Sequence, residues 1–131
     1  MQTAGTLYIV ATPIGNLGDI TLRALETLKS VEAILCEDTR VTKKLLFHYE
    51  ITKTTVSFHE HSDARKVESL IQRLEGGESM ALVTDAGTPG LSDPGNVLVG
   101  AAISSGISVV AIPGVSALTA LVSVAGIDMR E

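Results

Sequence analysis

Short apolar runs alternate with amphipathic segments along this chain, and the alternation predicts an ordered series of strands and helices. Four short apolar runs predict buried strands at residues 7–11, 33–36, 80–84 and 109–112, and the β-branched and aromatic residues at 54–58 predict a fifth strand. Between them, apolar residues at helical spacing predict helices at residues 22–28, 41–49, 67–74 and 94–105. Asp19 or Thr21 is placed to cap the first helix, and Gly76 and Gly106 are placed to end the third and fourth.

Continuous apolar strands that alternate with helices are typical of parallel sheets, because parallel strands need crossover connections and are buried on both faces. We therefore expect an α/β fold with a five-stranded, mostly parallel sheet and helices on both faces. In such a sheet the carboxyl ends of the strands share one edge, and ligands bind there. The polar loops that follow the five strands should open onto that edge.

A fifth helix is expected over residues 116–125, with Ser116 at its cap and Gly126 at its end. Its residues are apolar nearly all round, so it offers no polar face to water. Another surface must cover such a helix in a small domain. We therefore expect residues 1–131 to form a single domain that is one half of a larger object.

Length and composition limit the possible classes of protein. With 131 residues, 45% hydrophobic and 19% charged, the chain has the size and balance of one globular domain. The formal net charge of −5 would not by itself attract a polyanion, so any contact with nucleic acid needs a local basic patch.

The single cysteine, Cys36, rules out an internal disulfide and is expected to be a small core residue. No apolar run approaches the roughly 20 residues of a membrane span, and the N-terminus lacks the pattern of a signal peptide. We therefore expect a cytoplasmic protein.

Two loops are suited to holding a ligand. The loop at residues 84–95 is rich in glycine, proline and short polar side chains, so backbone amides can approach a bound molecule closely along a rigid wall. The loop at residues 113–117 leads into a helix whose first amides could receive a carboxylate or other polar atoms. An elaborate connector is the alternative interpretation of the longer loop.

Dinucleotide binding is a weaker alternative. The first loop, at residues 11–19, lacks both the G-x-G-x-x-G fingerprint and the Gly-Lys-Ser/Thr of a phosphate loop. Glu37 and Asp38 nevertheless lie about 20 residues further on, where a dinucleotide-binding domain contacts a ribose. The motifs alone therefore leave this interpretation open.

Five sequence blocks together resemble one family. They are Val-Ala-Thr-Pro-Ile-Gly-Asn-Leu-Gly-Asp-Ile-Thr at residues 10–21, Cys-Glu-Asp-Thr-Arg at 36–40, Ser-Phe-His-Glu-His at 57–61, Thr-Asp-Ala-Gly-Thr-Pro-Gly-Leu-Ser-Asp-Pro-Gly at 84–95 and Pro-Gly-Val-Ser-Ala at 113–117. In this order they closely resemble the tetrapyrrole-methylase superfamily and, within it, the branch of ribosomal RNA small-subunit methyltransferase I. The resemblance implies transfer of a methyl group from S-adenosylmethionine to the ribose 2′-oxygen of a cytidine in small-subunit (16S) ribosomal RNA. It also implies a homodimer of two-domain subunits, of which this chain resembles the amino-terminal S-adenosylmethionine-binding domain and lacks the carboxyl-terminal one.

By position, the same resemblance implies a set of cofactor contacts from three loops. They are Pro13, Gly15, Asp85, Ala86, Gly87, Thr88, Pro89, Leu91, Ser92, Pro113, Gly114, Ser116 and Ala117. Backbone amides and carbonyls suit the adenine and methionine ends of the cofactor, and a short carboxylate such as Asp85 suits ribose hydroxyls or the sulfonium charge.

A ribose hydroxyl is a poor nucleophile until its proton is accepted, so a general base is expected. Glu37, Asp38 and His59 are the candidates for this catalytic role. For the two carboxylates, helix capping and surface solvation are an equally weighted alternative. His59 and His61 lack a third ligand, so no metal site is expected.

Arg40, Lys43 and Lys44 form the only dense basic patch near the expected ligand edge, and with His61 they are candidates for contacts with RNA. A solvated helix face is the alternative. The expected partner is small-subunit ribosomal RNA or the small ribosomal subunit. Two other functions stay open at this stage, namely methylation of a tetrapyrrole or another small molecule, and a non-catalytic, Rossmann-like nucleotide-binding module.

Overall fold

The computed structural model describes residues 3–13, 17–58, 64–85 and 93–114. Its five strands are β1 (Thr6–Thr12), β2 (Ala33–Cys36), β3 (Thr54–Ser57), β4 (Met80–Asp85) and β5 (Ser108–Ile112). Its helices are α1 (Leu22–Ser30), α2 (Thr39–His48), α3 (Ala64–Glu75) and α4 (Asp93–Ser104), with a short 3-10 turn, η1 (Leu17–Asp19), before α1. The predicted strands and these four helices are confirmed, whereas the helix expected over residues 116–125 lies outside the described residues.

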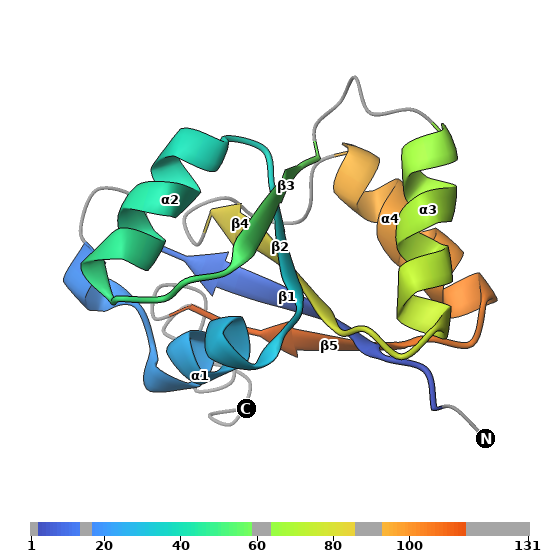
Figure 1. The fold of residues 1–131 in the computed structure, drawn as a ribbon, viewed down its shortest axis with the longest axis horizontal. Coiled ribbons are helices and arrows are strands. Elements are labelled where there is room, and N and C mark those ends of the chain that lie inside the picture. Colours follow the sequence, from blue (N-terminus) through green and yellow to red (C-terminus); the bar gives the residue numbers. More distant parts are fainter. Residues whose placement is uncertain (1–2, 14–16, 59–63, 86–92, 115–131) are drawn as a thin grey trace, which may run out of the picture.

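All strands of the single sheet run parallel, in the order β3-β2-β4-β1-β5 (Figure 1). In the centre, Val10 of β1 is in register with Val83 of β4 on one side and with Ile112 of β5 on the other. β1 and β2, which follow one another in the sequence, are therefore not neighbours in the sheet, because β4 lies between them. This confirms the predicted parallel α/β fold.

Each face of the sheet has its own apolar core, as the alternation of strand side chains requires. In β2, Ala33 and Leu35 belong to a cluster with residues of α3 and α4, while Ile34 between them packs in a second cluster with residues of α1 and α2. Figure 1 shows these two pairs of helices on opposite sides of the sheet. The prediction of helices on both faces is confirmed.

The helix ends follow local hydrogen-bonding rules. Thr21 caps α1, since its Oγ1 accepts a 3.1 Å hydrogen bond from the backbone N–H of Ala24. At their carboxyl ends, α2, α3 and α4 each close with the paired backbone hydrogen bonds of a Schellman motif. The residue in the left-handed region is Gly77 after α3 and Gly106 after α4, but it is Glu50 after α2, with φ of 56°.

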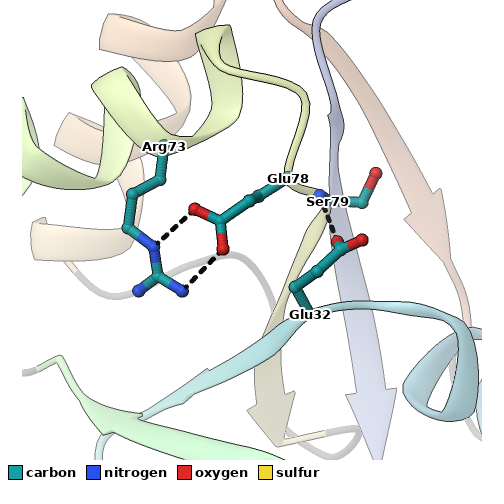
Figure 2. Close-up of polar contacts among 4 residues, drawn as sticks. All are labelled: Glu32, Arg73, Glu78 and Ser79. Carbon is teal, nitrogen blue, oxygen red and sulfur yellow. Dashed lines mark hydrogen bonds and ion pairs between the residues drawn. The ribbon is translucent and has the colours of Figure 1, made fainter.

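A network of polar contacts connects the turns at the edge of the sheet where the strands begin (Figure 2). The backbone N–H of Ser79 donates to Oε2 of Glu32 at 2.5 Å, and the Ser79 hydroxyl accepts from the backbone N–H of Thr6 at 3.0 Å. Beside it, Arg73 forms a two-pronged ion pair with Glu78 at 3.0 and 3.2 Å. These contacts join the turns before β1, β2 and β4, at the edge opposite to the polar loops.

Within the described ranges, no helix combines the length and the apolar character that a membrane crossing requires.

Candidate functional site

The candidate site lies at the carboxyl edge of the sheet, where the strand order decides which loops are neighbours. β4 stands between β2 and β1, and β5 follows β1. Thr12 at the end of β1 is in register with Asp85 at the end of β4. The Thr12 hydroxyl also donates to the backbone carbonyl of Thr84 at 3.0 Å, which ties the two strand ends together just before their loops begin.

The helices that follow these strands also point to the carboxyl end of β4 as the ligand site. The helix after β4 is α4, whereas β1 and β2, which flank β4, lead into α1 and α2 on the opposite face. In open α/β sheets, ligands bind at the carboxyl ends of neighbouring strands whose connections diverge in this way. The topology therefore favours ligand binding on both sides of β4.

Four of the predicted cofactor residues fall in the described part of the chain. Pro13, Asp85, Pro113 and Gly114 follow or end β1, β4 and β5, which are consecutive in the sheet, and Gly114 is buried. The structure thus brings the starts of all three predicted loops together. The other predicted cofactor residues lie outside the described residues: Gly15, Ala86, Gly87, Thr88, Pro89, Leu91, Ser92, Ser116 and Ala117.

The two candidate carboxylates follow β2, on the other side of β4, and their environments differ. Asp38 is the N-cap of α2, and its Oδ1 accepts hydrogen bonds from the backbone N–H of Arg40 at 2.9 Å and from Arg40 Nε at 3.4 Å. These contacts, the backbone one above all, lower the pKa of the Asp38 carboxyl. Glu37 is exposed, and no hydrogen bond or ion pair engages its carboxylate within the described part of the chain. Helix capping therefore accounts for Asp38, whereas the exposed Glu37 is compatible both with surface solvation and with a catalytic role.

His59 and His61 lie outside the described residues, but the residue before them is fixed. Phe58 is buried, and its backbone N–H donates to the carbonyl of Cys36 at 2.8 Å, so the pairing of β2 and β3 extends to the residue that precedes Glu37. Among the residues that the structure describes, no three side chains of the metal-ligating types gather into a metal site.

The predicted basic patch lies on α2, which begins directly after Glu37 and Asp38. Arg40, Lys43 and Lys44 are all exposed, and their spacing places them along one side of the helix. The structure therefore keeps these three cations together, near the end of β2.

Cys36 is a buried core residue at the end of β2, as predicted. Burial raises the pKa of its thiol, which lies 3.9 Å from the backbone carbonyl of Val56. Two features of this region were missed by the sequence reasoning. They are the bond from Thr12 to Thr84, for which the sequence carries no local signal, and the exposed Phe47, which continues the spacing of Arg40, Lys43 and Lys44 on α2.

An open parallel sheet with glycine- and proline-rich loops at its carboxyl edge defines a class of α/β domains that bind cofactors. The sequence profile of the tetrapyrrole (corrin/porphyrin) methylases matches residues 6–131. The chain therefore belongs to the tetrapyrrole methylase family, which confirms the family resemblance.

Curated relatives match nearly the whole chain. A protein named ribosomal RNA small subunit methyltransferase I from Synechocystis sp. is 51% identical over 123 residues, which are 94% of this chain and 44% of the relative. A protein of the same name from Xylella fastidiosa is 53% identical over 131 residues, which are 100% of this chain and 48% of the relative. The chain thus spans less than half the length of these relatives.

Solved structures show the same fold. Uroporphyrin-III-C-methyltransferase from Thermus thermophilus superimposes with a TM-score of 0.66 at 25% identity, over 89% of this chain and 52% of that one. A cobalt precorrin-4 methyltransferase gives a TM-score of 0.66 at 20% identity, over 92% of this chain and 50% of the other. A Thermus thermophilus uroporphyrin-III C-methyltransferase solved with S-adenosylhomocysteine gives 0.58 at 22% identity, over 85% and 45% of the two chains.

Proposed function

We propose that this chain is the cofactor-binding part of an S-adenosylmethionine-dependent methyltransferase that acts on the ribose 2′-oxygen of a cytidine in small-subunit ribosomal RNA. The observation that carries the proposal is the strand order at the carboxyl edge. It groups the loops after β4, β1 and β5 on one side and the end of β2, with Glu37, on the other. The names of the curated relatives support the ribosomal RNA substrate.

The described residues fit a cofactor that is held largely by main chain. Pro13, Pro113 and the buried Gly114 present little side chain where the loops begin, and the Thr12 to Thr84 bond keeps β1 and β4 in register there. Amides and carbonyls in such loops match the adenine, the ribose and the amino-acid end of S-adenosylmethionine. In this proposal Asp85, Ala86, Gly87, Thr88, Pro89, Leu91, Ser92, Ser116, Ala117 and Gly15 complete the site.

On the acceptor side, the residues must orient a ribose hydroxyl and accept its proton. Bound S-adenosylmethionine supplies the methyl group as an electrophile. Glu37 is our first candidate for the base, because its carboxylate is exposed and has no partner among the described residues, whereas that of Asp38 caps α2. His59 is the second candidate, since the preceding residue is fixed beside the end of β2. Positioning of the hydroxyl in line with the methyl group contributes the rest of the rate enhancement.

The remaining parts of the proposal concern the partners. The cations Arg40, Lys43 and Lys44, with His61, contact the phosphates of the RNA or of the small ribosomal subunit. We propose that the protein works in the cytoplasm, where small ribosomal subunits are found. We also propose that the complete protein is a homodimer, in keeping with the family resemblance.

Methyl transfer by the chain joined to its natural continuation tests the proposal. Small ribosomal subunits are incubated with methyl-labelled S-adenosylmethionine, the RNA is digested, and label is expected in 2′-O-methylcytidine. Asp85→Ala should weaken cofactor binding in titration calorimetry, while Glu75→Ala, an exposed carboxylate at the other end of the sheet, should not. If the Asp85 variant keeps full affinity, the assignment of this site is wrong.

A matched pair of substitutions separates the two adjacent carboxylates. Glu37→Gln should lower kcat by about 10²- to 10⁴-fold with an unchanged dissociation constant for the cofactor, as expected for loss of a general base. Asp38→Asn removes the same charge one residue later but keeps a good N-cap, so it should retain most of the rate. Equal losses from both variants would refute the distinction between them.

The alternatives give different results in the same assays. Transfer of label to a tetrapyrrole but not to RNA would identify a small-molecule methyltransferase. Binding of NAD with no affinity for S-adenosylmethionine would identify a nucleotide-binding module and refute the methyltransferase proposal.

A further inference from the structure

One exposed side of α2 combines positive charge with an aromatic ring. Arg40, Lys43, Lys44 and Phe47 are spaced by three, one and three residues, so their side chains share one side of the helix. We call these four residues the α2 face. α2 itself begins shortly after the end of β2 (Figure 1), and Glu37 lies between these two elements in the chain.

Phe47 packs in neither apolar core of the part of the chain that the structure describes. Its side chain is 87% exposed, whereas its neighbours Leu45 and Leu46 are buried in the core that includes α1. A single exposed apolar residue is ordinary on a protein surface, so exposure alone assigns no function to Phe47. What distinguishes Phe47 is that it shares one side of α2 with three exposed cations.

The charge of the α2 face indicates the kind of partner. The chain as a whole carries −5, but three of its ten lysines and arginines lie between residues 40 and 44, and no acidic residue occurs from residue 39 to residue 49. Of the three cations, only Arg40 is in an ion pair within the described residues, with Asp38 at 3.4 Å. A polyanion is thus the complementary partner at this place on an otherwise acidic molecule.

We infer that the α2 face is a docking surface for unpaired RNA, in which Phe47 stacks on a nucleobase while Lys43 and Lys44 neutralise the adjacent phosphates. Cations that follow a backbone, together with an aromatic platform for bases, are the features by which proteins hold single-stranded nucleic acid. The inference rests on the proposed function for its substrate and adds the residue that distinguishes unpaired RNA from a duplex. α2 begins two residues after Glu37, so RNA that reaches the Arg40 end of the α2 face comes near the proposed base.

Binding of the chain to a short fluorescein-labelled RNA, measured by anisotropy over a range of salt concentrations, separates the two contributions. Phe47→Ala and Phe47→Leu should each weaken binding of the single strand about fivefold or more, as loss of one stacked base does, and should leave the salt slope unchanged. Lys43→Gln and Lys44→Gln should each reduce the slope of log K against log salt by about 0.7. Leu22→Ala is the matched control, because Leu22 is a 78% exposed apolar residue of α1 and is predicted to change neither quantity.

Three results would overturn the inference. Phe47 variants that bind the single strand like the wild type would show that the ring does not stack. An equal loss for the matching RNA duplex would show that it does not select unpaired bases. A shift in sedimentation coefficient caused by Phe47→Ala would identify the α2 face as an interface between copies of the chain.

The methyl-transfer assay distinguishes this failure from failure of the proposed function. If the extended protein methylates small ribosomal subunits and Phe47→Leu leaves KM unchanged, the α2 face is refuted and the function stands. If the wild type neither binds RNA nor transfers methyl to it, both proposals fall. A KM raised severalfold with kcat retained is the result that supports both.

Discussion

The close approach of Gly5 to the turn before β4 leads to a sharp prediction about stability. A Cβ atom at Gly5 would lie 1.9 Å from the carbonyl oxygen of Glu78, 2.4 Å from its carbonyl carbon and 2.8 Å from the nitrogen of Ser79. All three are backbone atoms, so no side-chain rotation can relieve the clash. Gly5→Ala therefore requires one of the two backbone segments to move.

The expected cost follows from the contacts that hold these segments. Gly5 donates a 2.7 Å backbone hydrogen bond to Leu74, and the next residue, Thr6, donates to the Ser79 hydroxyl at 3.0 Å. Moving the backbone strains or breaks both bonds, each of which contributes about 0.5–1.5 kcal/mol net. Overpacking alone typically costs about 1–3 kcal/mol. We expect Gly5→Ala to lower the free energy of unfolding by about 2 kcal/mol, after the smaller entropy of the unfolded chain has offset part of the cost.

Gly100→Ala is the matched control. Gly100 lies within α4, and a Cβ atom there would meet, within 4 Å, no atom of the described residues outside the adjoining backbone of its own helix. Since alanine is the better helix former by about 0.5–1 kcal/mol, this variant should be more stable than the wild type. Urea unfolding followed by circular dichroism, compared at equal m-values, measures both. If Gly5→Ala changes stability by less than about 0.5 kcal/mol, or if both variants shift in the same direction, the close approach of the backbones is not as described.

Three further predictions test local features of the same structure. Glu50→Gly should stabilise the chain by about 1 kcal/mol in urea unfolding, because Glu50 has φ of 56° at the end of α2, whereas α3 and α4 have Gly77 and Gly106 at the corresponding positive-φ position. Gly106→Ala should lower the stability, and no gain from Glu50→Gly would contradict this account. The hydrogen bonds from Arg73 lower the pKa of the Glu78 carboxyl below its ordinary value. Their contribution to stability is therefore complete above about pH 4.5 and is lost as the pH falls through the lowered pKa. Glu78→Gln should make the free energy of unfolding fall less steeply with decreasing pH in this range, and an unchanged fall would exclude this ion pair as its cause. Burial raises the pKa of Cys36, so iodoacetamide should label the native chain far more slowly than the urea-unfolded chain at pH 8, and equal rates would show that the thiol is accessible.

The sequence was sufficient for the elements and their faces because these depend on periodicity. Apolar runs identified the strands, and the spacing of Leu70, Ile71 and Leu74 identified the buried side of α3. Thr21 was named as a possible cap from its type and place, and the structure selects it. In each case the signal lies within a few residues of the element that it predicts.

Features that depend on contacts between distant segments could not be read in this way. Nothing in the local sequence shows that β4 pairs with both β1 and β2, or that Gly5 lies against Glu78, 73 positions away in the chain. The alternatives for the carboxylates were also undecided at that level, because Glu37 and Asp38 are adjacent and of similar chemistry. They differ in side-chain length and in backbone position, and the structure places the shorter Asp38 at the N-cap, where its Oδ1 accepts from the backbone N–H of Arg40.

Because β4 lies in the middle of the sheet, mutations at the ends of different strands should distinguish cofactor binding from turnover. β1 and β5 lie on one side of β4 and β2 and β3 on the other, so the carboxyl end of β4 lies between the strand ends of the proposed cofactor side and those of the proposed acceptor side. Substitutions after β5, at Gly114, should then affect cofactor affinity alone, and substitutions after β2, at Glu37, should affect turnover alone. Asp85, at the end of β4, is the position where both should change together. Double-mutant cycles should therefore show coupling between Asp85 and Gly114 and between Asp85 and Glu37, whereas the effects at Gly114 and Glu37 should add. Strong coupling between Gly114 and Glu37 would mean that the same loops bind the cofactor and act on the acceptor.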